Sequence, residues 1–187
     1  MDKQAKAEMV AKVTRLWEYV QGLFGQEITA LVVEPRLVHA FIHGDTEMHL
    51  GLRDRQDYFE EYRQCQHVWW EANETPWASG DAAVWMLVVH EFAHVLAARD
   101  RSFQPTTTRE IHSRPFQQAL AQIIARFPLA LAEALLADAP VTVSWTMTLP
   151  GTERPFTQTL SFPFYTDARP LLLGLWNGPA QPTVAVA

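Results

Sequence analysis

The chain has 187 residues, 48% of them hydrophobic, which suits one domain with an apolar core and is short for two. Its single cysteine, Cys65, excludes an intrachain disulfide framework and a cysteine-rich zinc ribbon, and favours a reducing compartment. The formal charge of −6 is the wrong sign for a domain that grips phosphate backbones, so charge does not support a nucleic-acid partner. No apolar run approaches the roughly 20 residues that span a bilayer, and the N-terminal residues do not resemble a secretory leader. We therefore expect a cytoplasmic protein without a membrane segment.

The first quarter of the chain predicts one helix followed by a small sheet. Residues 2–24 repeat apolar side chains at steps of three and four, the spacing of one helix face, before a stop at Gly25. Residues 28–33, 37–43 and 48–52 are expected to be short strands of a small antiparallel sheet, because turn residues separate them.

The rest of the chain predicts three helical stretches and a hairpin. Residues 81–99 contain neither Gly nor Pro and predict a helix with one apolar stripe. Residues 116–127 and 129–136 also read as helical, with a kink or join at the proline between them. The segments VTVSWTMTL and FTQTLSFPF alternate by twos around a Pro-Gly turn, the pattern of a β-hairpin. We expect an α+β fold with a single domain over residues 1–175 and a loose, flexible tail over 176–187.

The motif HEFAH in the second predicted helix carries the candidate chemistry. His90 and His94 are four residues apart, so both imidazoles lie on one helix face and can chelate one ion. Zinc binds imidazole nitrogen, and Glu91, next to the first ligand, can reach a zinc-bound water as general base. A catalytic zinc site needs a third protein ligand and leaves its fourth position to water. The alternative is a purely structural role, with two core histidines hydrogen-bonded to backbone carbonyls and a solvent-facing glutamate.

His112 is the best candidate for the third ligand, with Glu110 as its competitor. His112 follows His94 by eighteen residues, enough for a loop to bring the chain back over the helix face. The predicted zinc ligands are therefore His90, His94 and His112, and the predicted catalytic base is Glu91.

The segments HEFAH and IHSRPF together resemble the SprT-like zinc metallopeptidases, in which HExxH is followed by a histidine in a His-Gly-x-x-Phe-type segment. The resemblance covers residues 80–127 and implies a zincin-like fold, with His112 as third ligand and Phe116 packed beneath it. Ser113 stands where the family usually has glycine. Many relatives also carry a cysteine-rich zinc ribbon that this chain lacks, so the partner binding of that ribbon does not transfer.

The resemblance implies zinc-dependent hydrolysis of a peptide or protein substrate. The substrate would lie extended along an exposed sheet edge, for which the strands between Leu37 and Leu52 are candidates. Tyr165, Arg109 and Arg114 are candidate oxyanion donors, with nothing to choose between them. The alternatives are a zincin-fold binding or regulatory module that keeps its metal, such as an antirestriction-like or DNA-processing partner, and a metal-free interaction domain.

Other chemically notable residues have simpler interpretations. The alternation of His39 and His43, with His49 near by, invites a second metal site, but a half-exposed strand explains it more simply. Three tryptophans, Trp69, Trp70 and Trp77, could line a substrate cleft, although core or interface packing is the commoner role of such residues. Cys65 lies in a charged stretch without a nucleophile motif.

Overall fold

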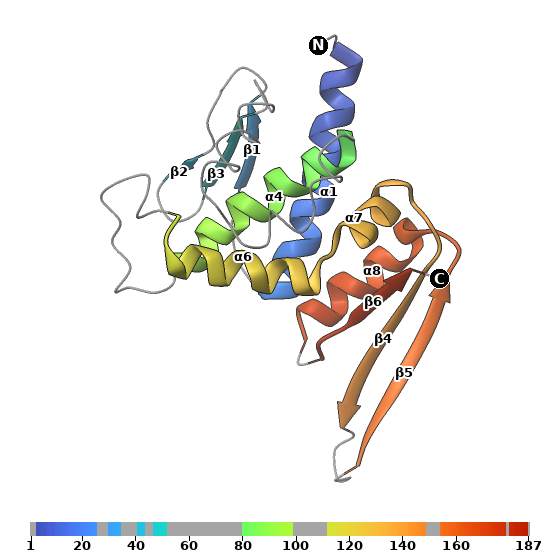
Figure 1. Ribbon diagram of the computed structural model, residues 1–187. Coiled ribbons are helices and arrows are strands. Elements are labelled where there is room, and N and C mark those ends of the chain that lie inside the picture. The colour runs from blue at the N-terminus through green and yellow to red at the C-terminus, as the bar shows by residue number, and fades with distance from the viewer. Residues whose placement is uncertain are drawn as a thin grey trace.

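A computed structural model describes residues 3–25, 30–34, 41–43, 47–51, 80–98, 112–148, 154–178 and 180–186. The chain is α+β, with helices around a central helix and two small sheets (Figure 1). The elements in chain order are α1 (Lys3–Phe24), β1 (Ala30–Glu34), β2 (Phe41–His43), β3 (Glu47–Gly51), α4 (Gly80–Ala97), α6 (Arg114–Arg126), α7 (Leu129–Leu136), β4 (Val141–Thr148), β5 (Pro155–Phe162), α8 (Tyr165–Trp176) and β6 (Thr183–Val186).

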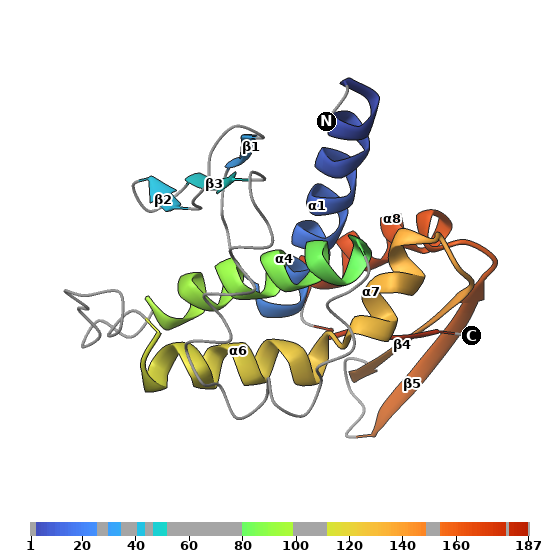
Figure 2. The ribbon, with the colours of Figure 1, turned by 45° about the horizontal axis from the view of Figure 1, so that its top comes forward.

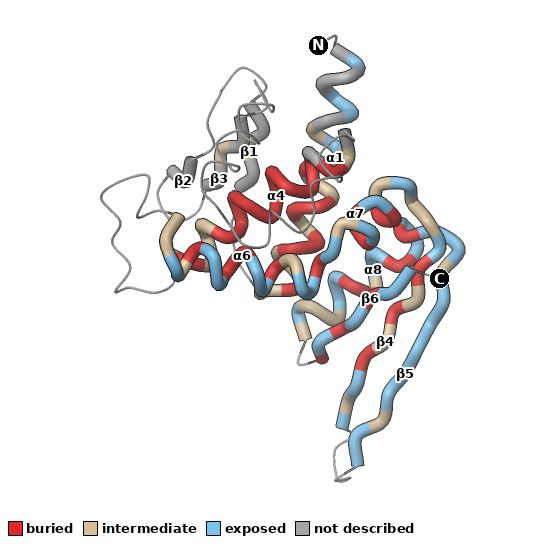
Figure 3. The backbone as a smooth tube through the Cα atoms, viewed as in Figure 1, coloured by how far each residue is buried: buried red, intermediate tan, exposed pale blue. Residues whose placement is uncertain are grey.

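Helix α4 occupies the centre of the molecule. Its sequence is apolar around most of its circumference, which corrects the expected single apolar stripe, and such a helix is stable in water only when its neighbours cover it on several sides. The small sheet of β1 to β3 lies on one side of α4 and α6 lies on the other (Figure 2). The described side chains from Val84 to Ala93 are all buried (Figure 3). Polar side chains placed on this helix are therefore held in a rigid, water-poor environment.

Aromatic contacts fix the helices around α4. The ring of Trp17 in α1 meets Phe92 of α4 edge to face, with centroids 5.2 Å apart. The indole Nε1 of Trp85 donates a hydrogen bond of 3.0 Å to the carbonyl oxygen of Phe127, the residue that ends α6. Pro128 then separates α6 from α7, at the position where the sequence predicts a break. Helix α4 is thus tied to α1 through Phe92 and to the end of α6 through Trp85.

The first sheet is mixed, which corrects the expectation of an antiparallel sheet. Strand β3 lies in the middle, with β2 antiparallel on one edge and β1 parallel on the other. The expected arrangement assumed that consecutive strands pair, whereas β1 passes over β2 and pairs with β3. Periodicity within a strand carries no information about which partner it takes. Among the described strands, β2 lies at an edge of this sheet, within the segment predicted to bind substrate.

The second sheet confirms the predicted hairpin and corrects the predicted tail. Strands β4 and β5 pair antiparallel from Val141↔Phe162 to Thr148↔Pro155. Strand β6 pairs with the other edge of β4, so residues 183–186 are part of the fold rather than a loose tail. The Gly- and Pro-rich residues before β6 look like a linker, but Val184 buries its side chain and offsets the ordering cost.

Among the described helices, none is by itself long and apolar enough to cross a membrane. Helices α6 and α7 meet that length and composition criterion only as a pair, bent by 57°.

Candidate metal centre

Two histidines of α4 meet on one face of the helix, as their spacing predicts. The Nε2 atoms of His90 and His94 lie 2.9 Å apart, and their ring centroids 4.6 Å apart. One of these nitrogens donates a hydrogen and the other accepts it, depending on the tautomers. Only 6% of His90 is exposed, so the pair sits at the edge of the core.

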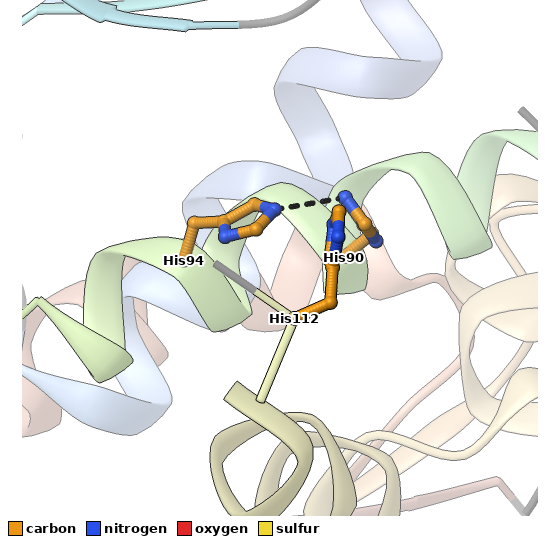
Figure 4. A group of neighbouring side chains, drawn as sticks. All are labelled: His90, His94 and His112. Carbon is orange, nitrogen blue, oxygen red and sulfur yellow. Dashed lines mark hydrogen bonds between the residues drawn. The ribbon is translucent and has the colours of Figure 1, made fainter. Parts of the chain in front are cut away.

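His112 closes the cluster from outside the helix. It lies in the turn before α6, and its ring centroid is 5.2 Å from that of His90 and 5.0 Å from that of His94. Figure 4 shows the three rings converging from α4 and from this turn. One ligand nitrogen from each of the three residues lies within 4.8 Å of the other two. The three residues could hold a metal ion, and they form the one such group among the described residues.

Phe116 lies against all three imidazoles. Its ring centroid is 5.0 Å from that of His90, 4.5 Å from that of His94 and 4.9 Å from that of His112, and its side chain is fully buried. It follows His112 by four residues, so the first turn of α6 places its ring beneath the cluster. The expected packing of Phe116 under the third ligand is therefore present.

Sequence reasoning did not identify Gln117 as a support of this turn. Its side-chain amide donates a 3.3 Å hydrogen bond to the carbonyl oxygen of His112, and its backbone N–H donates to the carbonyl oxygen of Ser113. Ser113 is the N-cap of α6 in extended conformation and makes no side-chain cap. A glutamine five residues after a candidate ligand, at a helix start, is the signal that could have indicated this contact.

The surroundings favour neutral imidazoles. Burial, followed by the proximity of His112, lowers the pKa of His94 to about 3. Burial, followed by the proximity of His94 and His112, holds the pKa of His90 well below its usual value. At neutral pH both rings therefore carry a lone pair for a cation without first losing a proton.

Glu91 places a carboxylate beside the nitrogen cluster. Only 4% of this residue is exposed, and its Oε1 lies 3.7 Å from His90 Nε2, the atom that also contacts His94. A cation among the imidazoles would lie close to this carboxylate, so its negative charge suits a metal centre formed by the three histidines.

The spacing of the ligand atoms fits a tetrahedral ion such as zinc. Nitrogens bound to zinc at about 2.0 to 2.1 Å are roughly 3.3 Å apart around the tetrahedron. The separations here, from 2.9 Å between His90 and His94 Nε2 up to the limit of 4.8 Å for the cluster, bracket that value. Three neutral nitrogen ligands with a nearby carboxylate are also the donor set of catalytic zinc sites.

The three oxyanion candidates differ in their positions. Tyr165 is buried in the core against Tyr19, with ring centroids 6.4 Å apart, and Tyr19 packs on Phe127 at the far end of α6 from His112. Arg114 is exposed at the first residue of α6, two positions after His112. Arg109 lies outside the described residues, as does Glu110, the competing ligand.

Most of the other singled-out residues also lie outside the described part of the chain. They are His39, Cys65, Trp69, Trp70 and Trp77. His49 is described and half-buried in β3, opposite Phe41 of β2. The group of potential ligands among the described residues does not include it.

Comparison with known proteins gives no match: no protein-family model fits the chain, and no curated protein or solved structure is significantly similar to it. A function for this chain therefore has to be argued from the site itself.

Proposed function

We propose that this protein is a zinc-dependent metalloendopeptidase of the HExxH type, similar to the SprT-like peptidases. The observation that carries the proposal is the buried carboxylate of Glu91, whose Oε1 lies 3.7 Å from His90 Nε2 at the edge of a three-histidine cluster. A carboxylate next to the first histidine can reach a metal-bound water without being a ligand itself, which is the position of a general base.

His90, His94 and His112 would hold the zinc ion. When bound, zinc supplies a Lewis acid that polarises a carbonyl oxygen and makes a neighbouring water more acidic, with a pKa near 7. The rigid attachment of α4 and the packing of Phe116 hold the ligands in place before metal binds, so little ordering is needed.

Glu91 would move the proton of the reaction. Its carboxylate accepts a proton from the attacking water, and the resulting carboxylic acid gives that proton to the amine that leaves when the peptide C–N bond breaks. Low solvent exposure leaves few waters near the carboxylic acid, so its proton goes to the leaving amine rather than to solvent. Arg114 is the described oxyanion candidate nearest to the cluster in the chain.

The test is proteolysis of casein by the zinc-loaded protein and by two matched variants. Glu91→Gln keeps the shape of the side chain and removes its basicity, so cleavage should fall by at least about a hundredfold while zinc content stays the same. Glu133→Gln, at an exposed position of α7, is the control and should cleave like the wild type.

The outcome that would contradict the proposal is cleavage that Glu91→Gln leaves unchanged, or zinc-loaded wild type that cleaves neither casein nor itself. Full zinc content without cleavage would instead favour the binding or regulatory module.

A further inference from the structure

A second candidate site lies at the opposite end of α6 from the histidines. A cavity of about 550 Å³ is bounded by the C-terminal half of α1, by the junction of α6 and α7, and by residues 181–186. This volume is within the range of about 300 to 1,000 Å³ typical of ligand sites. Phe116 and Arg126 are ten residues apart on α6, so roughly 15 Å of helix separates the histidine cluster from this cavity.

The cavity follows the backbone edge of β6. Side chains of a strand point alternately to its two faces, so a cavity above one face touches every second residue. Here all six consecutive residues from 181 to 186 line the cavity. The backbone of this segment therefore borders the cavity as well as its side chains, as happens where a cavity runs along the edge of a strand. Among the described residues, β6 pairs with β4 alone, so this edge keeps backbone donors and acceptors for another strand.

The wall facing β6 combines apolar surface with one positive charge. Leu23, Pro128 and Leu131 supply apolar contacts, and Arg126 is the one charged side chain among the described lining residues. The Arg126 guanidinium lies 4.5 Å from the centre of the Phe24 ring, which orients it at this end of α6.

Tyr19 also lines the cavity, and the positive charge of Arg126 acts on its hydroxyl. Burial raises the pKa of its hydroxyl above the usual value, and nearby Tyr165 adds to this, whereas Arg126 acts in the opposite direction. The guanidinium is therefore within electrostatic range of the cavity floor. Arg126 is exposed, so a carboxylate entering the cavity would meet a solvent-accessible cation, with which it can form a charge-assisted hydrogen bond.

We propose that this cavity, hereafter the β6 groove, binds an extended peptide segment that adds as a strand to the edge of β6 and places an acidic side chain against Arg126. Strand addition supplies affinity through main-chain hydrogen bonds, and the single cation supplies selectivity. The four residues of β6 span about 13 Å, so the groove accommodates a core of about four peptide residues. This inference does not depend on the peptidase proposal.

The first experiment selects peptides from a phage-displayed library of random octapeptides on the immobilised full chain. Wild type should enrich peptides that contain Asp or Glu among β-branched residues. Arg126→Glu should lose these peptides and enrich ones with Lys or Arg, and Arg126→Gln should enrich neither charge. Glu133→Lys, an exposed charge change on α7, should select the same peptides as the wild type. Matching thermal unfolding curves would show that the variants are folded.

A second experiment tests the strand geometry on one synthetic peptide from the selection. N-methylation of its backbone amides should weaken binding by about tenfold at alternate positions and change it little at the positions between, because every second amide faces β6. Amidation of the peptide C-terminus should have little effect, since an acidic side chain makes the contact. His112→Ala should bind the peptide like the wild type, which separates this site from the histidine cluster.

Three results would overturn the proposal. In the first, the wild type enriches no peptide from the library. In the second, Arg126→Glu binds the selected peptides as well as the wild type does. In the third, the effect of N-methylation does not alternate with a period of two residues. Dependence on the C-terminal carboxylate with no need for an acidic side chain would also refute it as stated.

Discussion

The Nε2 atoms of His90 and His94 lie within hydrogen-bond distance at 2.9 Å, one helical turn apart on α4. Two nitrogens that both bind a cation cannot also share a hydrogen, so a bound metal replaces that hydrogen bond. The helix already holds the two ligands close together, which reduces the conformational cost of binding. The consequences can be measured as stability, as affinity and as activity.

Zinc should stabilise the folded chain. A ligand that binds the folded state alone adds about 2.7 kcal/mol at a free concentration one hundred times its Kd. For a domain of this size that corresponds to a rise in Tm of roughly 5 to 10 °C. Differential scanning calorimetry with zinc and with EDTA measures the shift. His112→Ala should lose most of it, and an equal shift in this variant would exclude His112 as a ligand.

Phe116→Ala should weaken both the fold and the metal site. The substitution empties a fully buried position against three imidazole rings, at a cost of about 3 to 5 kcal/mol in unfolding free energy. Loss of the ligands' support should also weaken zinc affinity by about 10- to 100-fold. Urea unfolding in EDTA and competitive zinc titration measure the two effects. Ile123→Ala, buried further along α6, is the control and should lower stability with unchanged affinity.

Gly22→Ala should destabilise the protein although alanine is the better helix former. A Cβ at this position would overlap the Trp176 ring of α8, so α1 and α8 would have to move apart. Overpacking of this kind costs about 1 to 3 kcal/mol, more than the gain of up to about 1 kcal/mol from helix propensity. Gly174→Ala is the matched control, because a Cβ there meets no atom within 4 Å. Its stability in urea should equal or exceed that of the wild type.

Stability should fall at high pH because of Tyr165. Burial, followed by the negative charge of Glu18, raises the pKa of its hydroxyl to about 12, whereas the unfolded chain titrates near 10. Between these values the unfolded state loses the proton and the folded state keeps it, so unfolding becomes easier as pH rises. The contribution of Tyr165 to the unfolding free energy should be level below pH 10 and drop by up to about 3 kcal/mol by pH 12, and buried Tyr19, whose pKa is also raised, adds a decrease of the same sign. In Tyr165→Phe the fall should be smaller, and an identical pH profile would contradict this assignment.

How far the sequence predicts the structure depends on the range of the interactions involved. The four-residue spacing of His90 and His94 is local, so helix periodicity alone places them together, and the turn before α6 brings in His112. The partner of β1 and the pairing of β6 with β4 are non-local, and no pattern within those segments encodes them. The β6 groove was not predicted for the same reason, because Arg126 and Val184 come together only through the packing of whole elements.

The metal content of the purified protein tests the central claim most directly. Wild type, His112→Ala and His49→Ala are reconstituted with zinc, freed of excess metal and measured by elemental mass spectrometry. The comparison sets a candidate ligand, His112, against His49, a half-buried histidine outside the cluster. The three-histidine site predicts close to one zinc per chain in wild type and His49→Ala and a sharp loss in His112→Ala. A wild type that takes up no zinc, or a His112→Ala variant that keeps as much as the wild type, would contradict it.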